Sequence, residues 1–337
     1  MSYLSIGLLT SVLTLVALFR FAGRAATSKS VPRSGGVAMA LAIGVSGLLA
    51  AVIPIGSSHV PAAGLLPALA GGFLIFLIGR IDDLRPLPPI VKLVGQIGAA
   101  TLSYSLGLRA GFIPEGPWNQ VFTVFCLVGG ANALNLIDGV DGLAAGIAAI
   151  AAATLFFIAR DLGNVNAAVL AVSLTGGALA FSWFNLPPAR VYMGDAGSNL
   201  LGFGLAAVPL LLSWSPDGFA NFSVAILLLA VPIVDTATTI IRRLALGRSP
   251  LVGDHDHIHH RLLRRGWPVG AVLLFFHGIT LLIAVAIRFG ESILSISVDR
   301  TLVAWLALSS LLILSAVFNL SAAKPSAGPK LNDESEF

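Results

Sequence analysis

Charged residues are scarce in this sequence. Asp, Glu, Lys and Arg make up 11% of its 337 residues, against roughly 25% in an average soluble domain. This scarcity excludes an ordinary soluble enzyme. The chain also has a single cysteine, Cys126, which excludes an intrachain disulfide and a cysteine-based metal cluster.

Apolar residues take the place of the missing charge. They make up 56% of the chain, and the mean hydropathy is +0.92. Runs of roughly 20 apolar residues, long enough for a helix to cross a bilayer, have centres near Leu13, Gly44, Leu69, Gly98, Phe125, Ala149, Val172, Ala206, Leu228, Ile279 and Ala307. The sequence therefore predicts an all-α polytopic membrane protein with about 11 transmembrane helices, or about 10 if the weakly polar segment 109–119 does not separate two of them.

Basic residues divide unevenly between the two sides of the predicted membrane. With eleven helices in alternating directions, sixteen of the 20 Lys and Arg residues lie on one side of the membrane. The other four lie on the opposite side and are Arg109, Arg160, Arg288 and Arg300. Lys and Arg mark cytoplasmic loops, so we expect the N-terminus outside and the C-terminus in the cytoplasm. The net charge of +4 belongs to short loops beside a lipid bilayer, and we expect no nucleic-acid partner.

The sequence is expected to form a single integral-membrane domain over residues 1–320. Basic residues follow its first apolar run where a signal peptide would have a cleavage site, so this run is predicted to be retained. From about residue 321 the chain turns to Ala, Lys, Pro, Ser, Gly and acidic residues, which cannot bury a core. Residues 321–337 are therefore predicted to form a disordered cytoplasmic tail.

Carboxylates gather near the predicted cytoplasmic ends of the apolar runs. They are the adjacent Asp82 and Asp83, then Asp138 and Asp141, then Asp195 and Asp235. A carboxylate at a membrane edge is costly to desolvate unless it meets a metal ion, a partner or water. Several at one depth predict a shared polar cavity.

A divalent cation is one way to neutralise this cluster. Asp82 and Asp83 repel each other unless a cation or a basic group lies beside them. Mg²⁺ accepts a few oxygen ligands, retains water and bridges substrate phosphates, and Mn²⁺ accepts similar ligands, whereas Zn²⁺ prefers Cys and His. For this acidic pair alone, a solvated cap at a helix end is the alternative.

Amide and carboxylate side chains alternate along one stretch of the chain. Asn132, Asn135 and Asp138 recur every three residues, which places them in one stripe of a helix, and Asp141 follows at the next step. Lys92 is expected to point at the same cavity. It either pairs with a phosphate or extends toward the lipid headgroups.

The longest predicted cytoplasmic loop, roughly 242–268, holds four of the six histidines. They belong to the stretch Asp254-His-Asp-His-Ile-His-His-Arg261. A zinc site is disfavoured because no spacing matches a zinc motif and close neighbours cannot all face one ion. These side chains are expected to donate hydrogen bonds to a phosphate or sugar diphosphate, with His able to carry charge near neutral pH.

Together these residues resemble the polyprenyl-phosphate N-acetylhexosamine-1-phosphate transferases of glycosyltransferase family 4. The resemblance rests on Asp82-Asp83 followed by Lys92 and Gln96, on Asn132-x-x-Asn135-x-x-Asp138-Gly-x-Asp141-Gly, on Met193-Gly-Asp195-x-Gly-Ser198, and on His257-x-His259-His260-Arg261-Leu. The histidine motif is more similar to that of the undecaprenyl-phosphate N-acetylglucosamine-1-phosphate transferases than to that of the phospho-N-acetylmuramoyl-pentapeptide transferases.

The resemblance implies a reaction in a bacterial cytoplasmic membrane. A UDP-N-acetylhexosamine, with UDP-N-acetylglucosamine the first choice, would transfer its sugar 1-phosphate to undecaprenyl phosphate and release UMP. This would initiate a lipid-linked cell-envelope glycan such as O-antigen lipopolysaccharide. The donor sugar stays open, and so do the choice between monomer and homodimer and the choice between direct displacement and a covalent aspartyl intermediate.

The resemblance also implies roles for individual residues. The implied metal ligands are Asp195 first, then Asn135, Asp82 and Asp83, and the catalytic candidates are Asp82, Asp83, Asp138 and Asp141. The implied substrate-binding residues are Lys92, Asn132, His257, His259, His260 and Arg261.

A cation- or proton-coupled transporter is the alternative from another class, because acidic residues within membranes also form ion and proton relays. It predicts carboxylates through the depth of the bilayer, whereas the motifs here lie near one boundary. A membrane metalloprotease is disfavoured, since neither His-Glu-x-x-His nor a serine–lysine arrangement is evident.

Overall fold

The computed structural model describes residues 2–25, 31–53, 62–245, 247 and 257–294. These residues form twelve α-helices and no strand. The helices are α1 (Tyr3–Ala25), α2 (Gly35–Val52), α3 (Ala62–Leu84), α4 (Pro89–Ser105), α5 (Pro117–Ile137), α6 (Leu143–Asp161), α7 (Val165–Asn185), α8 (Gly194–Leu212), α9 (Gly218–Leu227), α10 (Ala230–Ala245), α11 (Ile258–Arg264) and α12 (Val269–Leu294).

Seven of the described helices, α2, α3, α5 to α8 and α12, are long and apolar enough to cross a membrane. The helices α9 and α10 together make an eighth candidate, bent by 77° at its break. The chain is therefore an all-α multi-pass membrane protein, as the sequence predicts. The number of crossings and the orientation stay predictions, and both the run centred on Ala307 and the tail 321–337 lie outside the described residues.

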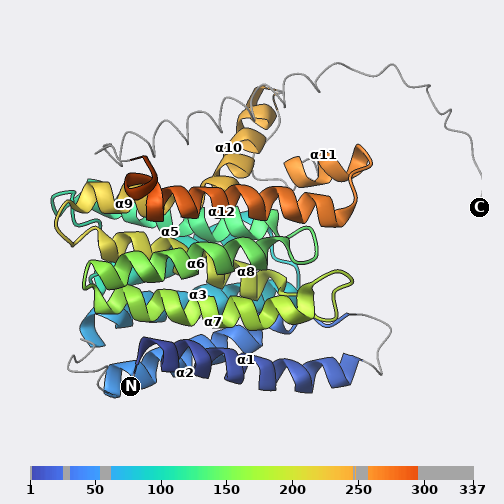
Figure 1. The fold of residues 1–337 in the computed structure, drawn as a ribbon, viewed down its shortest axis with the longest axis horizontal. Coiled ribbons are helices and arrows are strands. Elements are labelled where there is room, and N and C mark those ends of the chain that lie inside the picture. Colours follow the sequence, from blue (N-terminus) through green and yellow to red (C-terminus); the bar gives the residue numbers. More distant parts are fainter. Residues whose placement is uncertain (1, 26–30, 54–61, 246, 248–256, 295–337) are drawn as a thin grey trace, which may run out of the picture.

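The apolar run centred on Leu228 is not one continuous helix, which corrects the sequence prediction. Leu228 caps the end of α9, and α10 starts at Ala230. Pro232 has no backbone N–H with which to bond the Leu228 carbonyl four positions earlier, and this weakens a continuous helix at that point. The break turns α10 away from the other helices (Figure 1).

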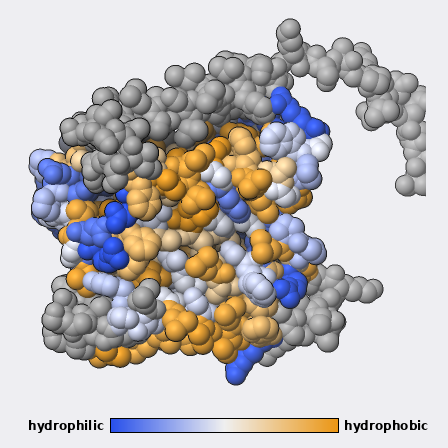
Figure 2. Space-filling model, in the orientation of Figure 1, coloured by the Kyte–Doolittle hydropathy of each residue, from blue (hydrophilic) through white to orange (hydrophobic). Residues whose placement is uncertain are grey.

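The long helices otherwise lie side by side with roughly parallel axes (Figure 1). The most buried of them, α8, packs against α2, α3, α5 and α7. It lies close against α5, where a Cβ on Gly202 would be 2.3 Å from the Gly130 carbonyl oxygen. Figure 2 shows apolar side chains across the middle of one face, with the most hydrophilic residues mainly toward the helix ends.

Backbone hydrogen bonds join two distant segments at one end of the helices. The N–H groups of Gly35 and Gly36 donate to the carbonyls of Tyr192 and Met193, each at 3.0 Å, and the Tyr192 N–H donates to Pro32 at 2.9 Å. The start of α2 is thereby fixed to the segment that leads into α8. The ends of α3, α5 and α7 meet at the same place, and their side chains build the candidate site.

Candidate functional site

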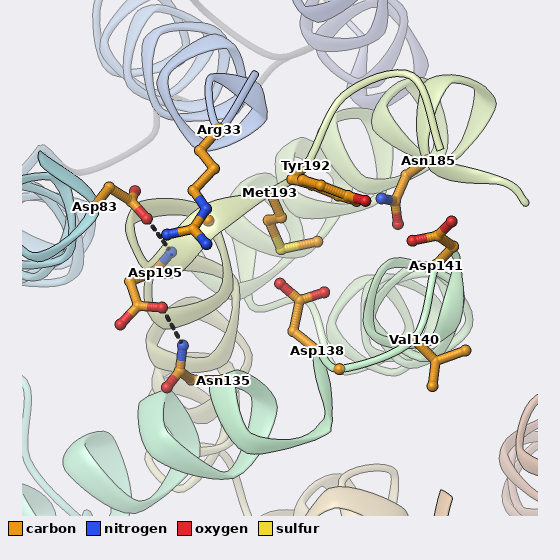
Figure 3. Close-up of a pocket in the computed structure, with 12 residues that line it drawn as sticks. Arg33, Asp83, Asn135, Asp138, Val140, Asp141, Asn185, Tyr192, Met193 and Asp195 are labelled. Carbon is orange, nitrogen blue, oxygen red and sulfur yellow. Dashed lines mark hydrogen bonds between the residues drawn. The ribbon is translucent and has the colours of Figure 1, made fainter. Parts of the chain in front are cut away.

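A cavity of about 330 Å³ opens at this end of the protein. Its lining combines four carboxylates, one guanidinium, two amides and one phenol ring: Arg33, Asp83, Asn135, Asp138, Gly139, Val140, Asp141, Asn185, Tyr192, Met193, Gly194 and Asp195. Figure 3 shows Arg33, Asp83 and Asp195 at one end, Asp141 and Asn185 at the other, and Asp138 and Tyr192 between them. The lining carries more negative than positive charge.

Asp83 caps the start of α8 from a neighbouring helix. Its Oδ1 accepts the N–H of Asp195 at 2.8 Å, and its Oδ2 accepts the N–H of Ala196 at 3.1 Å. The first N–H groups of a helix have no partner within it, and a negative charge there is favourable. Gly194 turns the chain with a φ of +69°, and a Cβ on it would lie 2.7 Å from both Asp83 oxygens. The glycine is therefore required for this cap.

Asp82 points to different partners from those of its neighbour. Its Oδ1 accepts the Leu87 N–H at 2.7 Å, and its Oδ2 lies 3.0 Å from Lys92 Nζ. Lys92 also pairs with Asp195. The repulsion between Asp82 and Asp83 is thus relieved by a lysine on one side and a helix start on the other. Asp82 and Lys92 do not line the cavity but hold Asp195 in place at its edge.

Of the two predicted asparagines, Asn135 lines the cavity and Asn132 lies beside it. Asn135 donates from its amide nitrogen to Asp195 Oδ1 at 3.2 Å and to Ser198 Oγ at 2.9 Å. Asn132, one turn earlier, donates to Gln96 Oε1 at 2.7 Å. Gln96 in turn donates to Asn199 at 3.0 Å. Asn132 therefore belongs to an amide network that ties α4, α5 and α8 together beside the cavity.

Asp138 extends into the middle of the cavity (Figure 3). Burial and the nearby carboxylates of Asp195, Asp141 and Asp83 raise its pKa well above the ordinary value. Asp141 is held differently, because its Oδ2 accepts the Ala189 N–H at 3.0 Å. Among the four lining carboxylates, Asp138 is the one whose side-chain oxygens accept no hydrogen bond from the part of the chain described, so it is the one most in need of a cation or a proton.

The histidine motif lies against the cavity wall. A Cβ on Gly139 would be 2.9 Å from Nε2 of both His259 and His260, so α11 covers the turn between α5 and α6. His257 precedes α11, with its Nδ1 2.8 Å from Asp235 Oδ2, and Arg261 is buried within α11. The site therefore includes a segment more than a hundred residues away in sequence from the turn that it covers.

The prediction that these histidines can carry charge near neutral pH is wrong for His259. Its side chain is 0% exposed, and burial lowers its pKa to about 3. Neither ring nitrogen has a hydrogen-bond partner within the described residues. His259 is therefore a neutral ring, because the charged form would lose its hydration without an adequate replacement.

Three lining residues with polar side chains were not singled out from the sequence as site residues: Arg33, Asn185 and Tyr192. Arg33 belongs to the basic segment between the first two helices, and its positive charge could have marked it as a candidate. Asn185 holds the turn after Asp141, because its Oδ1 accepts the Gly142 N–H at 2.9 Å. Asn185 is the last residue of α7, and Tyr192 lies in the short segment that leads to α8. No periodic pattern there predicts which way either side chain points.

The described residues contain no cluster of three or more His, Cys, Asp or Glu side chains that could hold a metal ion. In this structure those side chains do not form an all-protein cage. Mg²⁺ needs no such cage, because one or two carboxylates with water and substrate phosphates suffice. The oxygens of Asp138 accept no hydrogen bond from the described residues. Asp195 accepts Asn135 and Lys92 through its two oxygens, but each oxygen keeps a second lone pair for a cation. Both oxygens of Asp83 accept backbone N–H groups at the start of α8, and Asn135 turns its amide nitrogen toward Asp195.

Comparison with known proteins gives a consistent family assignment. The family model for glycosyl transferase family 4 matches residues 65–213, which include all four lining carboxylates. The chain is 33% identical over 296 residues to the "Probable undecaprenyl-phosphate N-acetylglucosaminyl 1-phosphate transferase" of Bacillus subtilis (strain 168), covering 85% of this chain and 78% of that protein.

Two further relatives are similar over a smaller share. The "Decaprenyl-phosphate N-acetylglucosaminephosphotransferase" of Mycolicibacterium smegmatis is 35% identical over 266 residues, which cover 70% of this chain and 66% of the relative. The "Undecaprenyl-phosphate alpha-N-acetylglucosaminyl 1-phosphate transferase" of Escherichia coli (strain K12) is 29% identical over 225 residues, which cover 62% of this chain and 60% of the relative.

Proposed function

Because the chain belongs to glycosyl transferase family 4, we propose that it transfers N-acetylhexosamine 1-phosphate from a UDP-sugar to undecaprenyl phosphate and releases UMP. UDP-N-acetylglucosamine is the proposed donor, in agreement with the names of the relatives. The observation that carries the proposal is the carboxylate-lined cavity at one end of a multi-pass membrane protein. We place the reaction in a bacterial inner membrane, as the first step of a lipid-linked cell-envelope glycan.

The charges of the cavity support a divalent cation as a third component. Both substrates are anionic, and four carboxylates against one guanidinium would repel them. Asp195 and Asp138 are the proposed donors to Mg²⁺ or Mn²⁺. When bound, the cation would neutralise charge on the diphosphate and on the departing UMP. Lys92 and Asn135 hold the Asp195 carboxylate from two sides, which keeps it in position.

One end and the middle of the cavity suit the two parts of a nucleotide sugar. Arg33 can pair with phosphate oxygens, since a guanidinium matches their geometry. Tyr192 presents the aromatic ring in the lining, a flat surface on which a uracil base can stack. His260 approaches from the side of Gly139, and Arg261 follows it in α11. The diphosphate would then lie between Arg33 and Asp138.

The transfer itself requires little proton chemistry. The second pKa of a phosphate monoester is near 6, so the acceptor is largely dianionic at neutral pH. In direct displacement an acceptor oxygen bonds to the β-phosphorus as the bond to the UMP oxygen breaks. In the alternative an aspartate oxygen first displaces UMP from that phosphorus, and an acceptor oxygen then displaces the aspartate. Labelled UMP would exchange into UDP-N-acetylglucosamine without the acceptor only by the second route.

Turnover by the purified protein tests this proposal. Protein in detergent would receive undecaprenyl phosphate, Mg²⁺ and a panel of UDP-N-acetylhexosamines, with UMP release as the measurement. We expect release with one sugar and its loss in Asp195→Asn. Ser173→Ala, which changes a buried residue of α7 far from the cavity, is the matched control and should keep full activity.

The opposite outcome would identify the alternative function. Absence of UMP from every sugar, with folded protein, would overturn the transferase proposal. Flux assays in liposomes would then test the cation- or proton-coupled transporter.

A further inference from the structure

Asp235 is a buried carboxylate outside the cavity lining. It lies in α10, and 1% of its surface is exposed. A charge in an apolar segment is costly unless other groups compensate for its lost hydration. Its Oδ2 is 2.8 Å from His257 Nδ1, and its Oδ1 accepts the backbone N–H of Ile258 at 2.8 Å. Each oxygen therefore has its own partner.

Both partners of Asp235 belong to the start of α11. This helix has seven residues, too few to be stable in isolation. Asp235 accepts the N–H of its first residue and contacts the ring of the residue before it. The carboxylate therefore attaches α11 to α10, and α10 packs against α5 and α12.

A chain of ring contacts connects this attachment to the cavity. The rings of His257 and His259 stack with centroids 5.6 Å apart at an interplanar angle of 7°. The rings of His259 and His260 follow at 4.3 Å. Both of these rings contact Gly139, which lines the cavity. A shift of His257 would thus move the wall beside Asp138.

We propose that Asp235 is a positioning residue for the nucleotide-sugar end of the site, acting through His257 and the start of α11. The identity of the affected substrate rests on the proposed function. Asp235 itself does not line the cavity, so its effect reaches the substrate only through the histidine segment 257–260.

The variant Asp235→Asn tests this role at constant size. The asparagine oxygen can still accept the Ile258 N–H, but an NH₂ group replaces the oxygen that faces His257. His257 Nδ1 must then accept a hydrogen bond instead of donating one. The proton of the neutral ring therefore moves from Nδ1 to Nε2. We expect the KM for UDP-N-acetylglucosamine to rise roughly tenfold or more, with the KM for undecaprenyl phosphate unchanged.

Two companion variants separate positioning from loss of folding. His257→Asn removes the other partner and should raise the same KM, and the double variant should be no worse than either single one. Thr236→Val is the matched control, because this neighbouring hydroxyl is buried and has no hydrogen-bond partner in the described structure. It should leave both KM values unchanged.

The hydrogen bond can also be observed without turnover. In protein labelled with ¹⁵N-histidine, His257→Asn identifies the His257 signal among the six histidines. We expect protonated Nδ1 in the parent and protonated Nε2 in Asp235→Asn. An unchanged His257 signal, or unchanged KM values in both variants of an active enzyme, would overturn the inference. A parent that releases no UMP would instead contradict the proposed function and leave the spectroscopic result to decide the role of Asp235.

Discussion

The two ends of the helices use the same charged residue types in different ways. At the cavity end, the side chains of Lys92 and Asp82 are 15% and 14% exposed, and Lys92 also pairs with Asp195. At the other end, Arg160 pairs with Asp161, and their side chains are 46% and 39% exposed. Exposed pairs contribute about 0–1 kcal/mol, whereas enclosed charges must be compensated in place. The cavity end therefore holds enclosed charges whose partners are fixed in place, whereas the opposite end holds exposed pairs that contribute little to stability.

Removal of divalent cations should produce the largest effect at the cavity end. Exhaustive EDTA treatment is expected to lower UMP release by at least about a hundredfold, because charge on the diphosphate would no longer be neutralised. Mg²⁺ or Mn²⁺ added back should restore the rate. Undiminished release in EDTA would contradict the role assigned to Asp195 and Asp138.

The glycines Gly194 and Gly163 offer a matched pair, one at each end. Both have positive φ, +69° and +67°, but a Cβ at Gly163 would meet no atom within 4 Å. Gly163→Ala should therefore cost only backbone strain, about 1–2 kcal/mol. Gly194→Ala should lower the unfolding temperature further and abolish most UMP release, because it displaces Asp83. Thermal unfolding and turnover would be measured on both, and equal effects would refute the required fit at Gly194.

Asp138 should make the stability of the metal-free protein depend on pH. Its pKa is raised in the folded state, so the folded protein retains a proton that the unfolded chain releases above the ordinary value of 3.8. The contribution of this proton to the free energy of unfolding is fully present below pH 3.8. It is lost as the pH rises from there toward the raised pKa of the folded protein.

Asp138→Asn removes this loss. In EDTA, its unfolding temperature should exceed that of the parent at about pH 8 and equal it at about pH 3. The exposed Glu115→Gln, at the opposite end, should show no difference at either pH. A parallel shift of both variants would indicate a general charge effect instead of the environment of Asp138.

The smallest effect is expected for an ion pair at the end away from the cavity. Arg160→Ala leaves Asp161 with its second partner, Arg288, at 2.7 Å. The free energy of unfolding should change by less than about 1 kcal/mol, with UMP release unchanged. A large loss of activity would show that this end also takes part in function.

Much of the fold could be predicted because apolar length is a property of the local chain. Nine of the eleven run centres lie inside described helices, and Leu228 lies at a break. The motif carboxylates were also recognisable as candidate site residues, since isolated charges stand out in apolar sequence. The break between α9 and α10 was missed because a single proline, Pro232, does not reveal how far the next helix turns.

Local hydropathy and residue spacing are enough to identify a helical membrane protein with acidic motifs near one set of helix ends. The partners of each acidic residue depend on how the helices pack. Asp82 and Asp83 are adjacent, yet one pairs with Lys92 and the other caps α8 more than a hundred positions away. Hydropathy and spacing follow from neighbours in the chain, whereas the direction and burial of side chains such as His259 and Asp235 depend on which distant helices pack around them.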